Sequence, residues 1–185
     1  MTNVVRNLFL FVAWLSWPLV ATAEETKIVA LGASQTAGLG VSESDAYPAQ
    51  LEKILKAEGY SVSVANEGIS ADTTREILGR LTRAVPDGTK IVIVQPGTND
   101  DIRTKSRASL TREETKNNVE QMLARLKEKN IATVLLGYPG QGGSGALDGR
   151  EIAQKYSAVW YGQGGKDIPP EMFQADKKHF TKEGN

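Results

Sequence analysis

The sequence predicts an α/β protein built as a single domain, a three-layer α/β/α sandwich with a mostly parallel β-sheet. Two observations predict this fold. Short apolar runs alternate with longer segments whose apolar side chains recur at helical spacing, as expected for a parallel sheet covered by helices on both faces. The 185 residues also contain no internal repeat and no low-complexity linker, so a second domain is not expected.

The first 23 residues differ in composition from the rest. Arg6 is their only charged residue, residues 8–20 are largely apolar, and small residues precede Glu24 as at a signal-peptidase site. A membrane-spanning helix needs about 20 apolar residues, whereas this run is shorter and contains a serine and a proline. We therefore expect residues 1–23 to be a secretory signal peptide and residues 24–185 to form the domain. The protein is then secreted or periplasmic, with no stable membrane anchor.

The charge balance and the absence of cysteine exclude several classes of function. The 22 lysines and arginines match the 22 acidic residues, so nothing favours a nucleic-acid or anionic-membrane partner. Without cysteine the chain has no disulfide, no thiol nucleophile, no thiolate metal site and no lipid-modified N-terminal cysteine. No sequence pattern indicates an oligomeric state.

The first predicted elements alternate between strand and helix. Residues 27–32 are an apolar run that ends in small residues, which predicts a strand. Residues 47–58 have helical periodicity and stop before Gly59, a residue that commonly ends helices. Residues 61–65 predict a second strand, and residues 73–83 predict a second helix that is followed by turn residues.

The alternation continues through the middle of the chain. Residues 90–95 predict a third strand, the most β-branched run in the sequence. Thr111 and Glu114 form a Thr-x-x-Glu capping box, which predicts the start of a longer helix with one apolar face. Residues 132–138 predict a fourth strand.

The pattern weakens after the fourth strand. Residues 141–145 predict a glycine-rich loop, residues 151–161 a helix, and residues 162–174 mostly irregular structure. No fifth strand is predicted.

Three of the loops that follow predicted strands hold distinctive polar motifs. Ser34 lies in Gly-Ala-Ser-Gln, Gly68 in Asn-Glu-Gly, and Asn99 in Gly-Thr-Asn-Asp. Because parallel strands end at one edge of a sheet, these loops should meet there. A fourth motif, Asp-Lys-Lys-His, places Asp176 and the only histidine, His179, near the end of the chain.

These four blocks, in this order and at these distances, resemble the SGNH (GDSL-like) hydrolase family. Within it they look like the branch of small exported thioesterases, lysophospholipases and arylesterases. The neighbouring sequences NEGISADTT and PGTNDD also look like those of the family. The resemblance covers nearly all of residues 24–185. Each short motif alone is weak, but four in order are specific. The resemblance implies a flavodoxin-like sheet and hydrolysis of carboxylic esters or thioesters.

The resemblance also implies a role for each motif residue. Ser34 resembles the nucleophile, His179 the general base, and Asp176 the carboxylate that orients the base. The backbone N–H of Ser34, Gly68 and Asn99 resemble the donors of an oxyanion hole. The chemistry fits these residue types, because a serine hydroxyl needs an imidazole to take its proton and an asparagine amide can stabilise a developing oxyanion. Glycine permits close approach of the backbone to a substrate oxygen.

Asp100 and Asp101 raise the alternative of a metal site. No matching cluster of ligands accompanies them in the sequence, so we expect them to be solvated loop charges. Neither the nucleophile nor the oxyanion hole needs a metal, and the sequence implies no cofactor.

Two features depart from the family. The family usually has aspartate and leucine around its serine, where this chain has Ala33 and Gln35, so a carboxylate that supports the nucleophile loop is missing. The family also continues past its histidine into a terminal helix, whereas this sequence stops at Asn185. We therefore expect the terminal helix to be truncated, with a cost in stability and activity.

Two alternatives remain beside the hydrolysis of a small-molecule acyl ester or thioester. The same machinery serves a carbohydrate acetylesterase of the same fold. A secreted binding protein could also keep the fold without turnover, an alternative motivated by Ala33 and by the missing terminal helix.

Overall fold

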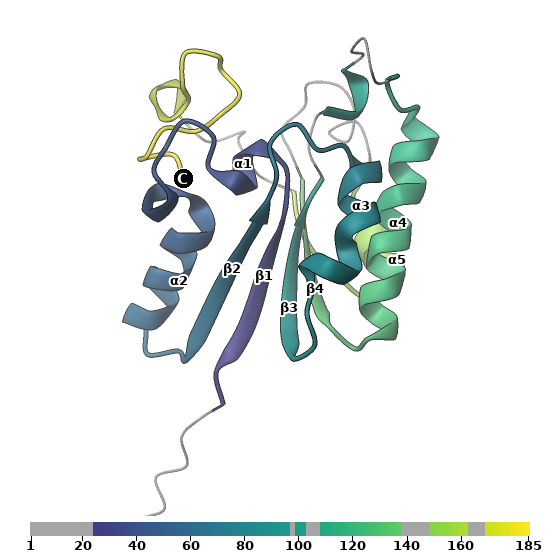
Figure 1. Ribbon diagram of the computed structural model, residues 1–185, viewed down its shortest axis with the longest axis horizontal. Coiled ribbons are helices and arrows are strands. Elements are labelled where there is room, and N and C mark those ends of the chain that lie inside the picture. The colour runs from purple at the N-terminus through teal and green to yellow at the C-terminus, as the bar shows by residue number, and fades with distance from the viewer. Residues whose placement is uncertain (1–23, 97–98, 103–107, 138–148, 163–168) are drawn as a thin grey trace, which may run out of the picture.

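The computed structural model describes residues 24–96, 99–102, 108–137, 149–162 and 169–185. Its strands form one parallel sheet in the order β2-β1-β3-β4-β5 (Figure 1). The strands are β1 (Thr26–Gly32), β2 (Val62–Gly68), β3 (Thr89–Gln95), β4 (Ala132–Leu136) and β5 (Val159–Tyr161). The helices are α1 (Ser34–Ala37), α2 (Tyr47–Ala57), α3 (Thr74–Ala84), α4 (Arg112–Glu128) and α5 (Gly149–Lys155), with short 3-10 helices η1 (Glu43–Asp45), η2 (Asn99–Asp101) and η4 (Pro170–Met172).

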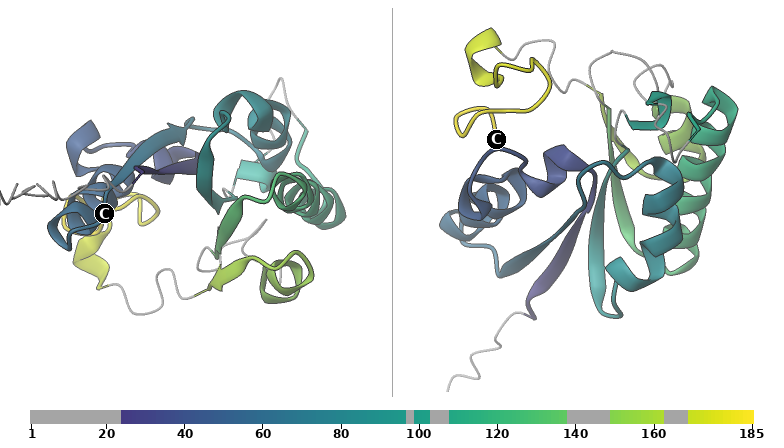
Figure 2. Two further views of the ribbon diagram at one scale, coloured as in Figure 1. Left: turned by 90° about the horizontal axis from the view of Figure 1, so that it is seen from below. Right: turned by 45° about the horizontal axis from the view of Figure 1, so that its top comes forward.

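Alternate side chains of the sheet belong to two separate hydrophobic clusters. On β1, Val29 and Leu31 join a cluster with residues of α3, α4 and α5, whereas Ile28 joins a smaller one that includes Leu51 and Leu55 of α2. Helices α3, α4 and α5 therefore cover one face and α2 the other, as the two views in Figure 2 show. The predicted three-layer α/β/α sandwich is confirmed.

Both long helices of the larger cluster begin with reciprocal caps. The predicted capping box of Thr111 and Glu114 is present at the start of α4. Thr73 and Glu76 form a second one at the start of α3. Each box satisfies two backbone N–H groups that a helix start leaves without partners.

Two predictions of element bounds are wrong. Residues 151–161 do not form one helix, because α5 ends at Lys155, Ser157 has a left-handed backbone (φ 61°), and β5 pairs with β4. The prediction of no fifth strand is also wrong, because three residues that follow soon after a helix are too few to show a periodicity of their own. Strand β2 extends to Gly68, so the Asn-Glu-Gly motif is the end of the strand and not a loop.

Several predictions concern residues outside the described ranges. The signal peptide at residues 1–23 and the glycine-rich loop at 141–145 lie there, and the described residues do not test the expected truncation of a terminal helix, so all three stay predictions. Of the helices in the described ranges, none combines the length and the apolar character that crossing a membrane requires.

Candidate active site

The carboxyl ends of three strands lie side by side. Gly32, at the end of β1, pairs with Gly68 of β2 on one side and with Gln95 of β3 on the other. Helix α1 begins at Ser34, just beyond β1, and η2 begins at Asn99, beyond β3. The three motifs associated with these strands therefore meet at one edge of the sheet, as the parallel topology predicts.

The C-terminal segment, residues 169–185, lies over this edge beside α1 (Figures 1 and 2). His179 Nε2 is 2.7 Å from Ser34 Oγ, and His179 Nδ1 is 2.6 Å from Asp176 Oδ2. The structure thus brings Ser34 and His179, 145 positions apart in the sequence, into one hydrogen-bonded chain with Asp176.

The charge state of Asp176 fixes the direction of these hydrogen bonds. The hydrogen bond from the His179 side chain, followed by those from the backbone N–H groups of His179 and Lys178, holds the pKa of Asp176 well below its usual range. An ionised carboxylate only accepts, so Nδ1 of a neutral imidazole must carry the hydrogen here. Nε2 is then an acceptor for the Ser34 hydroxyl, which is the state in which His179 can take a proton from Ser34.

Local hydrogen bonds shape the turn that carries Asp176 and His179. Asp176 Oδ1 accepts the backbone N–H of Lys178 at 2.9 Å and that of His179 at 3.0 Å. At the base of the turn, Phe173 and Phe180 form an antiparallel bridge, and their ring centroids are 4.9 Å apart. The three-residue spacing therefore folds into a closed turn that brings the carboxylate and the imidazole together.

Asn99 is oriented by the loop that follows β2. Its Nδ2 donates to the backbone oxygen of Asp72 at 2.9 Å, which uses one of the two hydrogens of the amide. That loop turns sharply, since the Asp72 N–H donates to the Ile69 oxygen and Ala71 between them has a φ of 70°. A left-handed alanine costs about 1 kcal/mol, and strained backbone clusters at functional sites. Nothing in the sequence marks Ala71, so sequence reasoning missed it.

Gly68 is predicted to donate its N–H to the oxyanion, but this N–H already has a hydrogen-bond partner. Its N–H donates to the side-chain oxygen of Asn66 at 3.0 Å, and Asn66 is exposed. Gly68 can therefore donate to a substrate oxygen only after the Asn66 side chain rotates away. A Cβ on Gly68 would overlap the backbone nitrogen of Ala37 in α1, so the close packing of β2 against α1 requires glycine.

We expect Gly68→Ala to destabilise the domain by about 1–3 kcal/mol, the usual cost of overpacking. Gly79 is the matched control, because it lies exposed inside α3 and an added Cβ would meet nothing within 4 Å. Gly79→Ala should stabilise the domain by about 0.5–1 kcal/mol, the difference in helix propensity. Urea unfolding of both variants measures this. Equal free energies of unfolding would contradict the packing of Gly68 against α1.

Arg80 connects two parts of the site and was also missed by the sequence analysis. Arg80 is 8% exposed, and its guanidinium donates from Nε to Asp72 Oδ2 at 2.8 Å and from Nη2 to the Gly32 oxygen at 3.0 Å. It thereby ties the end of β1 to the turn that orients Asn99. The available signal was a charged residue three positions after Ile77 on the buried face of a predicted helix.

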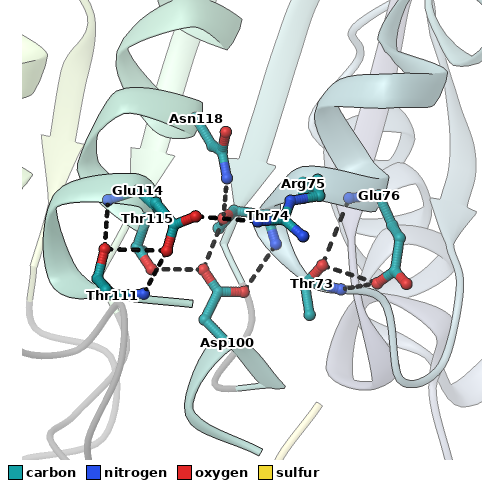
Figure 3. Close-up of polar contacts among 9 residues, drawn as sticks. All are labelled: Thr73, Thr74, Arg75, Glu76, Asp100, Thr111, Glu114, Thr115 and Asn118. Carbon is teal, nitrogen blue, oxygen red and sulfur yellow. Dashed lines mark hydrogen bonds and ion pairs between the residues drawn. The ribbon is translucent and has the colours of Figure 1, made fainter. Parts of the chain in front are cut away.

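Asp100 joins η2 to the starts of α3 and α4 (Figure 3). Its carboxyl oxygens accept from the backbone N–H of Thr74 at 2.8 Å, from the Thr74 hydroxyl at 2.6 Å, and from the Thr115 hydroxyl at 2.7 Å. Asn118 donates to the same Thr74 hydroxyl at 3.0 Å. This network fixes η2, and with it Asn99, to two helices.

The expectation that Asp100 is a solvated loop charge is wrong. Its exposed fraction is 0%, because three protein donors replace its water. Asp101 is exposed, as expected. Across the described ranges, no three His, Cys, Asp or Glu side chains group together in a way that could hold a metal ion.

Comparisons with known proteins agree with this architecture. The sequence profile of the GDSL-like Lipase/Acylhydrolase family matches residues 30–184. An SGNH-hydrolase family esterase, AlinE4, has a crystal structure that superposes with a TM-score of 0.72 at 29% identity, covering 89% of this chain and 90% of that one. The crystal structure of TesA superposes with a TM-score of 0.71 at 25% identity, covering 86% and 91%.

Two curated relatives are similar in sequence. Esterase TesA of Pseudomonas aeruginosa is 30% identical over 120 residues, which are 64% of this chain and 57% of that protein. An arylesterase of Vibrio mimicus is 28% identical over 117 residues, which are 63% and 56%. The matched region is thus little more than half the length of these relatives. Together with the family profile and the superposed folds, these similarities show that the chain belongs to the GDSL-like lipase/acylhydrolase family.

Proposed function

We propose that this chain is a serine-dependent hydrolase of carboxylic esters or thioesters, of the esterase, lysophospholipase or acyl-thioesterase type. Ser34 is the nucleophile, His179 the general base and Asp176 its orienting carboxylate. The observation that carries the proposal is the continuous hydrogen-bonded chain from Ser34 Oγ through the His179 ring to Asp176. This arrangement activates a serine in acyl transfer.

The reaction follows from the atoms in contact. His179 Nε2 takes the hydroxyl proton while Ser34 Oγ bonds to the acyl carbon, and the imidazolium is stabilised by Asp176. When the bond to the leaving group breaks, Nε2 returns that proton to the leaving oxygen or sulfur, and the acyl group stays on Ser34. Water then repeats the sequence with Nε2 as base, and releases the carboxylic acid and the free serine.

The developing oxyanion needs donors at the same edge of the sheet. Ser34 is the first residue of α1, so its backbone N–H has no carbonyl partner within that helix. Asn99 Nδ2 keeps a second hydrogen beyond the one given to Asp72. We propose these two donors, with Gly68 as a third that becomes available when substrate displaces Asn66 from it. One such donor contributes about 10²–10³ in rate.

Exposed apolar side chains beside the site favour acyl chains over acetate. Leu39, Ile69 and Ile102 are 47%, 43% and 42% exposed. Ile69 directly follows Gly68, Ile102 directly follows η2, and the Leu39 N–H donates to the Ser34 oxygen. Large exposed apolar residues near a reactive site are typical of surfaces that bind apolar ligands.

The test is a panel of nitrophenyl esters and thioesters of increasing acyl length, together with labelling by a fluorophosphonate probe. We expect medium acyl chains to be hydrolysed fastest and the probe to modify Ser34. Activity on acetate alone would favour a carbohydrate acetylesterase. No labelling of Ser34 would instead indicate a secreted binding protein.

We also propose that residues 1–23 direct export and are removed, so that the protein acts in the periplasm or outside the cell. The support is the sequence pattern described above. Mass spectrometry of the exported protein should find Glu24 as the first residue, and an intact N-terminus would contradict this.

On the acid side of the profile of kcat/KM against pH, the loss of activity should reflect the protonation of a single group. Protonated His179 cannot accept the Ser34 proton, so kcat/KM falls as the imidazole gains a proton. Asp176, whose pKa is held well below its usual range, stays ionised over this limb and adds no second step. The logarithm of kcat/KM should therefore fall with a slope of one as the pH decreases. A slope of two, measured where the fold remains intact, would show that Asp176 titrates with His179.

A further inference from the structure

One hydrogen-bonded chain reaches from the centre of the sheet to the turn that carries His179. Thr36 Oγ1 donates to Gln95 Oε1 at the end of β3, and Gln95 Nε2 donates to Gln35 Oε1, both at 2.5 Å. Gln35 Nε2 then donates to the backbone oxygen of Lys178 at 2.8 Å. Each amide uses its oxygen on one side and its nitrogen on the other, so the direction of the chain is fixed.

The two ends of this chain differ in how firmly they are held. Thr36 is 0% exposed and Gln95 is 8% exposed, so this series of hydrogen bonds starts from a buried position. Lys178 is an exposed residue between Asp176 and His179, in a turn shaped by local hydrogen bonds. Gln35 therefore connects the buried end of β3 to an exposed turn of the site.

We propose that Gln35 is a positioning residue, whose amide holds the Lys178 carbonyl and thereby sets the distance of His179 from Ser34. This inference rests on the proposed function. The family usually has leucine at this position, and a leucine side chain cannot donate a hydrogen bond to a carbonyl. Gln35 also follows the nucleophile directly in α1, so one short helix carries both the reacting hydroxyl and the group that holds the turn.

A second glutamine holds the base of the same segment. Gln174 Nε2 donates to the backbone oxygens of Leu39 and Phe180, each at 2.7 Å. Gln174 thus ties the base of the turn to Leu39, whereas Gln35 holds the turn itself beside the imidazole. The two contacts act on different points, so Gln174 does not replace the contact made by Gln35.

The reaction itself shows why a separate contact is needed. The hydrogen bond between Ser34 Oγ and His179 Nε2 exists only while the serine carries its proton. In the acyl-enzyme Oγ is bonded to the acyl carbon and has no hydrogen to donate, so this contact no longer holds the turn. His179 must nevertheless stay in place to activate water, and the bond from Gln35 to Lys178 does not involve Ser34 Oγ, so acylation leaves its donor and acceptor intact.

Two variants of Gln35 test the proposal. Gln35→Leu removes the hydrogen bonds that join Gln35 to Gln95 and to Lys178, and Gln35→Glu keeps an acceptor for Gln95 but places an oxygen against the Lys178 carbonyl. Because a displacement of about 1 Å can cost about 10²-fold in rate, we expect kcat to fall by about 10- to 100-fold in both, with KM within about threefold of wild type. Gln154→Leu, at an exposed position in α5, is the control and should match wild type.

Hydrogen–deuterium exchange measures the position of the turn without using catalysis. Exchange in residues 169–185 should rise in both Gln35 variants and not in Gln154→Leu, at temperatures well below melting. Wild-type kcat in either Gln35 variant would overturn the proposal, and so would unchanged exchange. A protein that lacks ester hydrolysis and labelling at Ser34, yet shows the exchange difference, would refute the proposed function while leaving the contact to Lys178 intact.

Discussion

Ser34→Ala and His179→Ala should each lower kcat by about 10⁴-fold or more, because a nucleophile and its base act as a unit. Asp176→Asn should remain measurably active, since the nucleophile and the base are still present. Asparagine cannot act as a charged acceptor for His179 Nδ1, however, so the favoured tautomer and the stabilisation of the imidazolium are both weakened. Steady-state hydrolysis of the best nitrophenyl ester in the panel measures all three variants.

The folded state should survive these changes. Removing the Ser34 hydroxyl eliminates one hydrogen bond in a partly exposed site, which costs about 1 kcal/mol. Melting temperatures close to that of wild type would show that the loss is chemical. Ser61→Ala, an exposed serine before the opposite end of β2, is the matched control and should keep full activity. Turnover by Ser34→Ala at the wild-type rate would refute the assignment of the nucleophile.

Local sequence patterns predicted much of the fold, because helices and strands differ in the spacing of their apolar side chains and in the residues at their ends. The capping box at Thr111 and the apolar stripe of α4 depend on neighbours within a few positions, so the sequence displays them directly. The edge of the sheet where Ser34 and Asn99 meet also follows, because parallel strands end together.

The contacts that join distant segments could not be predicted in this way. Gln35 reaches a carbonyl 143 positions away, and Arg80 ties the end of β1 to the turn at Asp72, which lies far from β1 in the sequence. The occupied N–H of Gly68 and the strained turn at Ala71 depend on backbone geometry, which residue types do not display. The sequence thus predicts candidate reacting groups more readily than the residues that hold them in place.

Asp100→Ala should lower the free energy of unfolding by about 3 kcal/mol or more, because three buried donors lose a carboxyl acceptor together. The backbone N–H of Thr74 has the largest penalty, since it cannot turn toward another partner. The hydroxyls of Thr74 and Thr115 can rotate and partly compensate. Domains are stable by only about 5–15 kcal/mol, so this loss is large enough to lower the melting temperature clearly.

Asp100→Asn distinguishes the hydrogen bonds from the volume of the side chain. It keeps the shape and one oxygen for the Thr74 N–H, and the rotated threonine hydroxyls can accept from its amide, so we expect a loss of about 1–2 kcal/mol. Asp101→Ala is the control, because Asp101 is the exposed neighbour and should change stability by less than about 0.5 kcal/mol. Asp100→Ala should also reduce kcat, since η2 carries Asn99. Equal stability of Asp100→Ala and Asp101→Ala would show that this network does not hold η2 to α3 and α4.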